Sequence, residues 1–365
     1  MPFILETSVN KISKVLEPFR LLVRAADVGP RRIAEWLPVA ARRLAGDLFL
    51  VNSTKDSELI EQAQSQPVAN ISAPKLEILG WSTTNLDQSS VNFGKMSYLK
   101  GLFIAYFYVY GEEDRNHDCL RLLQHFQFDA IPRLSILLTY FPTINGDIYL
   151  MEDMTVLPDI VFLNLIFFSS GYCIGPSLFH VLRMTTGVRR LKLELHNHYK
   201  REWFDTDICS KCVTYASPIG NTLGQHNKDL EDDTNWLCVI DIRILRTCVN
   251  LYSVFTELSH RTEFCGSDCV CDLPPNWTSE ELVLNSLREV QITNLRGTEN
   301  EFAVVERLFS WAAVLKQMTI NFHNSITVST ARELCEMLLS FSRPEISMKF
   351  YINQGSRKVL YVPED

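Results

Sequence analysis

The chain has 365 residues, of which 46% are hydrophobic and 21% are charged, and its formal net charge is −8. This composition is typical of a folded soluble protein and excludes a wholly disordered chain. Its 35 basic residues are scattered rather than gathered on one face, and its apolar runs are too short to cross a membrane, so we expect neither a nucleic-acid nor a membrane partner.

No secretory signal is recognisable at the start of the chain. Met1–Leu5 is too short to be the apolar core of a signal peptide, and the acidic residue Glu6 follows it directly. We therefore expect a protein of the cytoplasm and/or nucleus, whose ten cysteines remain reduced.

One short pattern recurs along the chain: an apolar residue, two variable residues, a second apolar residue, one variable residue and a third apolar residue. The clear copies are Leu76–Leu79–Trp81, Leu99–Leu102–Ile104, Ile160–Leu163–Leu165, Val188–Leu191–Leu193, Leu287–Val290–Ile292 and Leu315–Met318–Ile320. A weaker copy starts at Leu134–Leu137, with Thr139 in the third place. Successive copies start 23, 35, 26, 28, 99 and 28 residues apart, and most of these intervals lie near the leucine-rich-repeat period of about 20 to 29 residues.

Each copy is expected to form one short strand, because its last two apolar positions lie two residues apart and therefore share a strand face. A single strand cannot bury that face, whereas stacked copies can do so by pairing as a parallel sheet backed by helices. We therefore predict an α/β fold, namely an irregular leucine-rich-repeat solenoid whose parallel sheet is backed by helices.

The segments between the copies carry helical patterns that suit the backing layer. Glu112–Gln127 and Ser177–Thr185 each place their apolar residues on one helical face, and Gly187 can end the second helix. Thr298–Glu301 and Thr330–Glu333 both have the capping-box pattern, so each predicts the start of a helix.

Two further segments complete the predicted organisation. Trp203–Phe264 interrupts the series and holds either an insertion, which we favour, or degenerate repeats. Ile346–Ile352 alternates as a strand does, and a turn then leads to Lys358–Val362, which predicts a closing hairpin. The domains are then a linker-like N-terminal segment (1–35), leucine-rich repeats (36–200), the insertion or degenerate repeats (201–264) and a C-terminal region (265–365).

Several stretches carry a resemblance to a known family. The most specific lie in the C-terminal region: Cys269-Val-Cys271, Pro274-Pro-Asn-Trp277, Leu284–Ile292, Leu295-Arg-Gly297, Leu315–Ile320 and Pro344–Phe350. Earlier stretches add Ser72–Leu79, Leu157–Ile160, Phe179–Met184 and Gly187–Leu193. Together they resemble monocot plant F-box proteins with leucine-rich repeats and an FBD region. The resemblance spans Glu35–Asn197 and Cys265–Tyr351, about two thirds of the chain, and implies that 265–365 closes the solenoid as an FBD-like α/β unit.

The resemblance implies the substrate-recognition subunit of a ubiquitin ligase of the SCF type, in which an F-box holds a Skp-type adaptor and the repeats hold the target protein. Residues 1–35 depart from that pattern, because they lack the Leu-Pro-acidic turn and the Ser-Arg-Arg-Trp-like ending of the F-box. They resemble the linker after it, and Trp36–Val51 resembles the first repeat. Two functions stay open: a target-binding ligase subunit without its F-box, or an adaptor-independent interaction module such as a decoy or a decayed paralogue.

Two cysteine groups invite a zinc interpretation. Cys209 and Cys212 have a suitable spacing, but the second group, at Cys265, Cys269 and Cys271, is irregular and lies more than fifty residues later, whereas zinc ligands usually form two short-spaced pairs. We favour reduced thiols and predict no metal and no cofactor.

Motifs for catalysis are missing from the sequence. No nucleophile elbow, phosphate loop or paired-histidine zinc motif occurs. His196-Asn-His198 directly follows a predicted repeat strand and has no metal-site context. We predict no catalytic residues and a protein that is not an enzyme.

We expect the binding surface on the exposed face of the parallel sheet, where proteins of this architecture hold their partners. Alternation along three strands places nine polar residues there: Arg190, Lys192, Glu194, Glu289, Gln291, Thr293, Gln317, Thr319 and Asn321. The corresponding positions of the middle repeats are apolar, namely Ile136, Leu138, Phe162 and Ile166. Either neighbouring loops cover these apolar residues, or they form an apolar hot spot with polar flanks.

Overall fold

The computed structural model describes ten stretches of the chain: residues 19–24, 46–52, 69–83, 91–94, 96–113, 115–140, 148–185, 187–196, 277–354 and 357–361. All of them belong to one compact unit, which is formed by residues 1–198 and 262–365. The predicted insertion or degenerate repeats at 201–264 and the cysteines considered for zinc lie outside the described residues.

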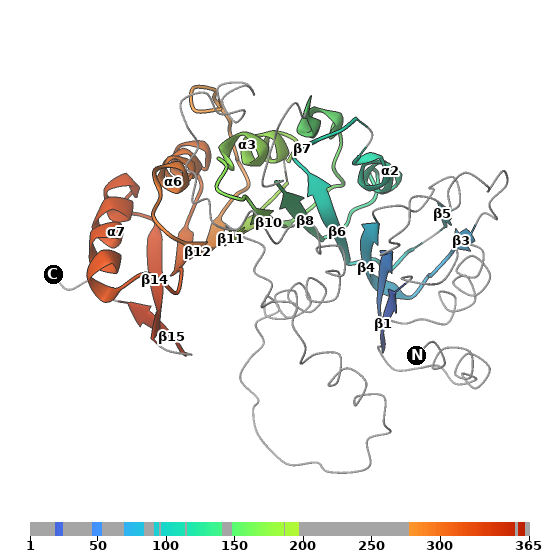
Figure 1. Cartoon of the computed structure of the whole chain (residues 1–365), viewed down its shortest axis with the longest axis horizontal. Helices are drawn as coiled ribbons and strands as arrows, with labels where there is room; N and C mark the ends of the chain where they lie inside the picture. The colour runs from blue at the N-terminus through green and yellow to red at the C-terminus, as the bar shows by residue number, and fades with distance from the viewer. Residues whose placement is uncertain are drawn as a thin grey trace, which may run out of the picture. The chain divides into compact units, whose positions relative to one another are not determined.

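The fold is mixed α/β, with a mostly parallel sheet of eleven strands among the described residues (Figure 1). All neighbouring pairs are parallel except the last pair. In their order across the sheet, the strands are β1 (Phe19–Arg24), β2 (Gly46–Asn52), β4 (Leu76–Thr83), β6 (Gly101–Tyr108), β8 (Arg133–Thr139), β10 (Phe162–Phe168), β11 (Arg190–His196), β12 (Glu289–Leu295), β13 (Gln317–Phe322), β14 (Ser347–Gln354) and β15 (Arg357–Tyr361).

Four short strands form two small sheets beside the main one. β3 (Ala69–Ile71) pairs in parallel with β5 (Val91–Phe93), and β7 (Tyr110–Gly111) pairs antiparallel with β9 (Ile148–Tyr149).

Helices lie along one side of the main sheet (Figure 1). Their apolar faces join the inward strand residues in one continuous core cluster. We call this side of the sheet the inner face and the opposite side the outer face. The helices are α2 (His117–His125), the 3-10 helix η4 (Leu150–Asp153), α3 (Gly175–Arg183), α6 (Glu299–Trp311) and α7 (Val328–Phe341).

One predicted helix start is confirmed and the other is wrong. Thr298 and Glu301 form the reciprocal capping box at the start of α6, as expected. α7 instead begins after Thr327, whose hydroxyl oxygen accepts the backbone N–H of Thr330 at 3.2 Å. Thr330 therefore lies inside the helix, because a threonine three residues earlier already caps it.

The repeated apolar positions fall into register across the sheet. Second positions form one row, Leu102, Leu134, Leu163, Leu191, Val290 and Met318. Third positions form the next row, Ile104, Ile136, Leu165, Leu193, Ile292 and Ile320. All twelve side chains are buried in the core cluster. Burial of one such side chain stabilises the fold by about 1.5–3 kcal/mol, so these two rows supply much of the driving force for stacking.

The weak copy of the pattern lies three residues earlier than the sequence suggests. Leu134 pairs with Leu163, a second position, so the copy reads Ile131–Leu134–Ile136 rather than Leu134–Leu137–Thr139. Since strand side chains alternate, a shift by an odd number of residues exchanges the two faces. Ile136 and Leu138 therefore point into the core cluster, and Leu137 lies on the outer face.

The two ends of the sheet can be compared with the predictions of an N-terminal linker and a C-terminal hairpin. β1 falls within residues 1–35, which we interpreted as a linker, yet it pairs in parallel with β2 along its whole length. At the other end, β14 and β15 form the predicted antiparallel hairpin. Between them, β11 pairs directly with β12, so the strands on either side of the long gap in the series are neighbours in the sheet.

A buried tryptophan connects helices α3 and α6. Trp277 is buried between α3 and α6, where its ring lies against Gly175 and near Trp311. A Cβ atom at Gly175 would overlap that ring. The glycine therefore allows the tryptophan to lie directly on the start of α3.

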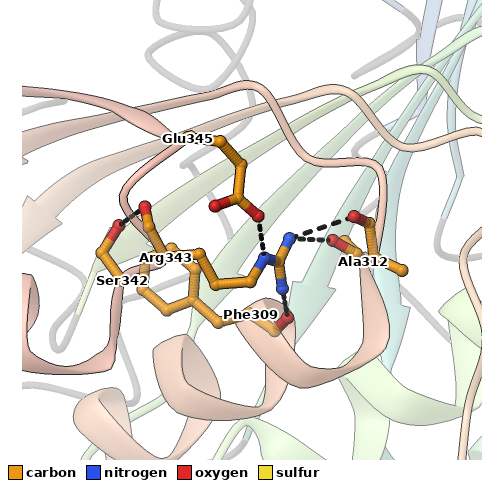
Figure 2. A network of polar contacts seen from close by, with 6 residues as sticks. Phe309, Ala312, Ser342, Arg343 and Glu345 are labelled. Carbon is orange, nitrogen blue, oxygen red and sulfur yellow. Dashed lines mark hydrogen bonds and ion pairs between the residues drawn. The ribbon is translucent and has the colours of Figure 1, made fainter.

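Arg343 closes the C-terminal end of α6 (Figure 2). Its guanidinium donates to the backbone oxygens of Phe309, Ala312 and Ala313 at 2.7, 2.9 and 3.2 Å, and its Nε donates to Glu345 Oε1 at 2.8 Å. The last carbonyls of a helix have no partner within the helix, and a cation is favoured there. One side chain thus caps α6 and fixes the segment that leads into β14.

Candidate functional site

The nine predicted polar residues meet on the outer face of β11, β12 and β13. Backbone pairing places them in three rows: Arg190, Glu289 and Gln317; Lys192, Gln291 and Thr319; Glu194, Thr293 and Asn321. None of them belongs to the core cluster on the inner face. We call these nine residues the polar patch. Their placement follows from strand alternation, as predicted, and whether they bind a partner stays a prediction.

Within the polar patch, an ion pair lies along β11. Lys192 Nζ is 2.8 Å from Glu194 Oε1, and the two side chains are only 6% and 10% exposed. Because little water screens them, the two charges interact more strongly than a pair on the open surface would. Beside them, the Arg190 guanidinium lies 5.6 Å from the centre of the Phe162 ring, a distance that suits a cation–π contact.

One side-chain hydrogen bond links β13 to β12, and a second lies along β13 itself. Asn321 Nδ2 donates to Thr293 Oγ1 at 3.2 Å, and Gln317 Nε2 donates to Thr319 Oγ1 at 3.4 Å. Among the described residues, no group donates a hydrogen bond to the buried Asn321 Oδ1, although an unsatisfied buried acceptor costs about 1–3 kcal/mol.

The accessibility of the polar patch is lowest on β11 and highest on β12. Lys192 and Glu194 are buried, whereas Gln291, Thr293 and Thr319 are half-buried. Glu289 is exposed. A partner would therefore meet a surface with mixed charge and many hydrogen-bonding groups, with a rigid ion pair at one side.

Sequence reasoning missed polar residues on both sides of the patch. Asn164 lies beside Lys192 in the register, and its Nδ2 donates to Ser135 Oγ on the next strand at 3.0 Å. On the other side, Lys349 pairs with Thr319 and Tyr351 pairs with Asn321. The correct register of β8 would have revealed Ser135, because it alternates with Leu134 and Ile136.

The apolar part of the predicted site differs from expectation. Ile136 and Leu138 belong to the core cluster, so their assignment to the outer face is wrong. Phe162 and Ile166 do lie on the outer face, in register with Arg190 and Glu194, but both are buried. This burial disfavours an exposed apolar hot spot and agrees with the alternative in which these positions are covered.

Three described residues with reactive side chains occupy packing positions, namely Cys119, Cys335 and His180. Burial raises the pKa of Cys119 and of Cys335 to about 12, so both thiols are protonated at neutral pH. His180 Nε2 lies 2.9 Å from the backbone oxygen of Met154, and burial lowers the pKa of this imidazole. Such a histidine donates one hydrogen bond and remains neutral, which suits a structural role.

In the part of the chain that the structure describes, no three or more His, Cys, Asp or Glu side chains gather as metal ligands would. The described helices are also too short or too polar to cross a membrane. Comparison with protein-family models, curated proteins and solved structures finds no match to this chain.

Proposed function

We propose that the chain is a protein-binding module, an irregular leucine-rich-repeat solenoid that holds a target protein on its outer face. The observation that carries this proposal is the polar patch, in which nine side chains from three adjacent strands stand in register. A broad surface of mixed polarity on rigid strands is suited to a protein partner, because it offers hydrogen bonds at fixed spacings.

The proposed context is a ubiquitin ligase of the SCF type, in the cytoplasm and/or nucleus, with the chain as its substrate-recognition part. The resemblance to monocot F-box proteins with an FBD region supports this context, and it relates α6, α7 and β12 to β15 to the FBD-like unit. The parallel register of the repeated apolar positions supports the solenoid.

The second candidate is an adaptor-independent interaction module, for example a decoy that competes with relatives for the same target. This candidate is the second interpretation that the sequence leaves open, in which the repeats bind a target without an adaptor. Both candidates use the same outer face, and they differ in whether the chain assembles with a Skp-type adaptor.

A differential capture experiment tests the shared part of the proposal. The bait is the full chain, compared with a Gln291→Arg/Thr319→Arg double variant in the polar patch and a Glu306→Arg/Glu336→Arg double variant on exposed positions of α6 and α7. We expect a set of proteins that the wild type and the helix variant capture and the patch variant loses. Equal capture by all three would contradict binding on the outer face.

A direct binding assay separates the two candidates. Purified Skp-type adaptor is titrated onto the purified full chain, with a complete F-box protein as the positive control. Saturable binding to the chain supports the ligase subunit. Binding to the control alone supports the adaptor-independent module.

A further inference from the structure

The carboxyl ends of β11, β12 and β13 bring together four side chains that the polar patch does not include. β11 ends at His196, β12 contains Asn294 and is followed by Arg296, and β13 is followed by His323. We call these four residues the rim cluster. In open parallel sheets, ligands commonly bind outside the carboxyl ends of the strands. All four residues are half-buried, so a ligand can reach them.

The backbone of β12 is distorted at this point. Asn294 has a φ of 65°, in the left-handed region, and the register with β13 shifts between Thr293 and Leu295. Residues other than glycine rarely adopt this conformation, and such outliers are frequent at functional sites. The Asn294 side chain lies 3.4 Å from His196 Nδ1 through its Nδ2, which donates there. The Phe168 ring stacks on the imidazole of His196, with 5.1 Å between ring centres.

Arg296 is the charged member of the rim cluster, and among the described residues its guanidinium has a single hydrogen-bond partner. That partner is His323 Nε2, at 3.2 Å. Arginine only donates, so Nε2 accepts this bond, while His323 Nδ1 lies 3.2 Å from the backbone nitrogen of Ser325 and 2.8 Å from Ser325 Oγ. One guanidinium has five N–H donors, and most of those on Arg296 are therefore available to a ligand.

The nearby carboxylate does not neutralise Arg296 by direct contact. Glu301 Oε2 accepts the backbone N–H groups of Arg296, Gly297 and Thr298 at 2.9, 2.8 and 3.1 Å. No carboxylate in the described part of the chain lies within ion-pair distance of the guanidinium. Burial lowers the pKa of Arg296, and the charge of the nearby Glu301 carboxylate partly opposes this shift.

We propose that the rim cluster binds an oxyanion, a carboxylate or a phosphate monoester, through the planar fork of Arg296, with the imidazoles of His323 and His196 beside it. A guanidinium matches two oxygens of such a group with two parallel hydrogen bonds. The backbone N–H groups of Arg296, Gly297 and Thr298, just before α6, are not the binding element, because the Glu301 carboxylate already accepts them. The site goes beyond the proposed function, since it lies at the strand ends and does not require a target on the polar patch.

Histidine NMR on the full chain tests the site. The Cε1–H signals of His196 and His323 are followed at pH 7.5 during titration with sodium acetate and, separately, sodium phosphate, with sodium chloride at matched ionic strength as the blank. The variants are Arg296→Gln and, as a matched half-buried control, Arg307→Gln, whose wild-type guanidinium already has a carbonyl and a ring as partners.

We expect saturable shifts of both signals in the wild type and in Arg307→Gln. In Arg296→Gln, binding should weaken by roughly tenfold or more, because a charge-assisted bidentate contact is lost. A response to acetate alone identifies a carboxylate ligand, and a response to phosphate alone identifies a phosphate ligand. Shifts that chloride reproduces, or equal affinity in Arg296→Gln, would overturn the proposal.

A further variant and a stability measurement cover the case in which Arg296→Gln does not fold. Arg296→Lys keeps the charge but loses the planar fork, so it should bind more weakly than the wild type. In the wild type itself, the bound anion should raise the melting temperature above that in matched chloride. An unchanged melting temperature in both acetate and phosphate would contradict the site.

Discussion

Strands β8 and β10 present the same inner face to the helices as strands β11, β12 and β13, but the two groups differ on the outer face. In β8 and β10, the outer positions include Leu137 and Ile166, which are fully buried. In β12 and β13, the corresponding positions are polar and mostly half-buried, as Thr293 and Thr319 show. The inner rows must match in every strand for stacking, whereas the outer rows are free to vary, so functional differences are expected on the outer face.

The largest expected effect is a loss of stability when an aspartate replaces a buried outer residue of β10. The same substitution at a half-buried outer residue of β13 should have little effect. Ile166→Asp places a carboxylate in a fully buried site and should lower the free energy of unfolding by about 3–5 kcal/mol. Thr319→Asp lies on the same face, half-buried, and should change it by less than about 1 kcal/mol. Equilibrium urea unfolding followed by circular dichroism measures both. Similar losses for the two variants would mean that the groups do not differ in burial.

A second prediction concerns the contact between α3 and Trp277. Gly175→Ala should destabilise the protein by about 1–3 kcal/mol, because the added Cβ overlaps the Trp277 ring. Without that ring, alanine at this helical position would stabilise by up to about 1 kcal/mol. The penalty should therefore disappear, or change sign, in a Trp277→Ala background.

Gly101→Ala is the matched control for this prediction. The added Cβ at Gly101 would meet Ile78 and Arg133 only at ordinary contact distances, 3.6 Å or more. Thermal unfolding of the wild type, the three single variants and the Gly175→Ala/Trp277→Ala double variant gives the comparison. A Gly175→Ala penalty that persists without Trp277 would show that another neighbour causes it.

The next effect concerns the cap of α6. Arg343→Ala removes the donors to three backbone oxygens and should cost about 1–3 kcal/mol. Glu345→Gln removes the ion pair and leaves those three bonds in place, so its effect should be smaller. Chemical unfolding at pH 7 of the wild type and both variants measures the difference. A larger loss for Glu345→Gln than for Arg343→Ala would contradict the cap.

The contribution of Glu345 should also depend on pH. Hydrogen bonds from the Glu345 backbone and the Arg343 side chain lower the pKa of this carboxyl. A lowered folded-state pKa stabilises the protein above the unfolded-state pKa, about 4.3, and the stabilisation is lost as the pH falls through the folded-state value. The stability difference between the wild type and Glu345→Gln should therefore be constant from pH 8 to pH 6 and vanish at the acid end. A difference that persists at pH 2 would rule out the ion pair as its source.

The inner face was largely predictable, because the apolar spacing repeats in most copies. β8 was the exception, since Leu134, Ile136, Leu137 and Leu138 are all apolar and the strand alone does not show which of its faces is inward. Only pairing with Leu163 on β10 defines it. The polar patch followed from alternation in strands that do contain polar residues. The rim cluster could not be predicted, because it joins His196 to Asn294, 98 residues apart, through a left-handed asparagine.

The central claim is that the outer face of β11 to β13 contacts the target, and site-specific photo-crosslinking tests it most directly. A photoreactive phenylalanine analogue is placed at Gln291 in the polar patch or, as the control, at Glu336 on the exposed side of α7. We predict that the chain with the probe at Gln291 forms a discrete crosslinked species in cell extract and that the chain with the probe at Glu336 does not. A discrete species from Glu336 with none from Gln291 would contradict the account.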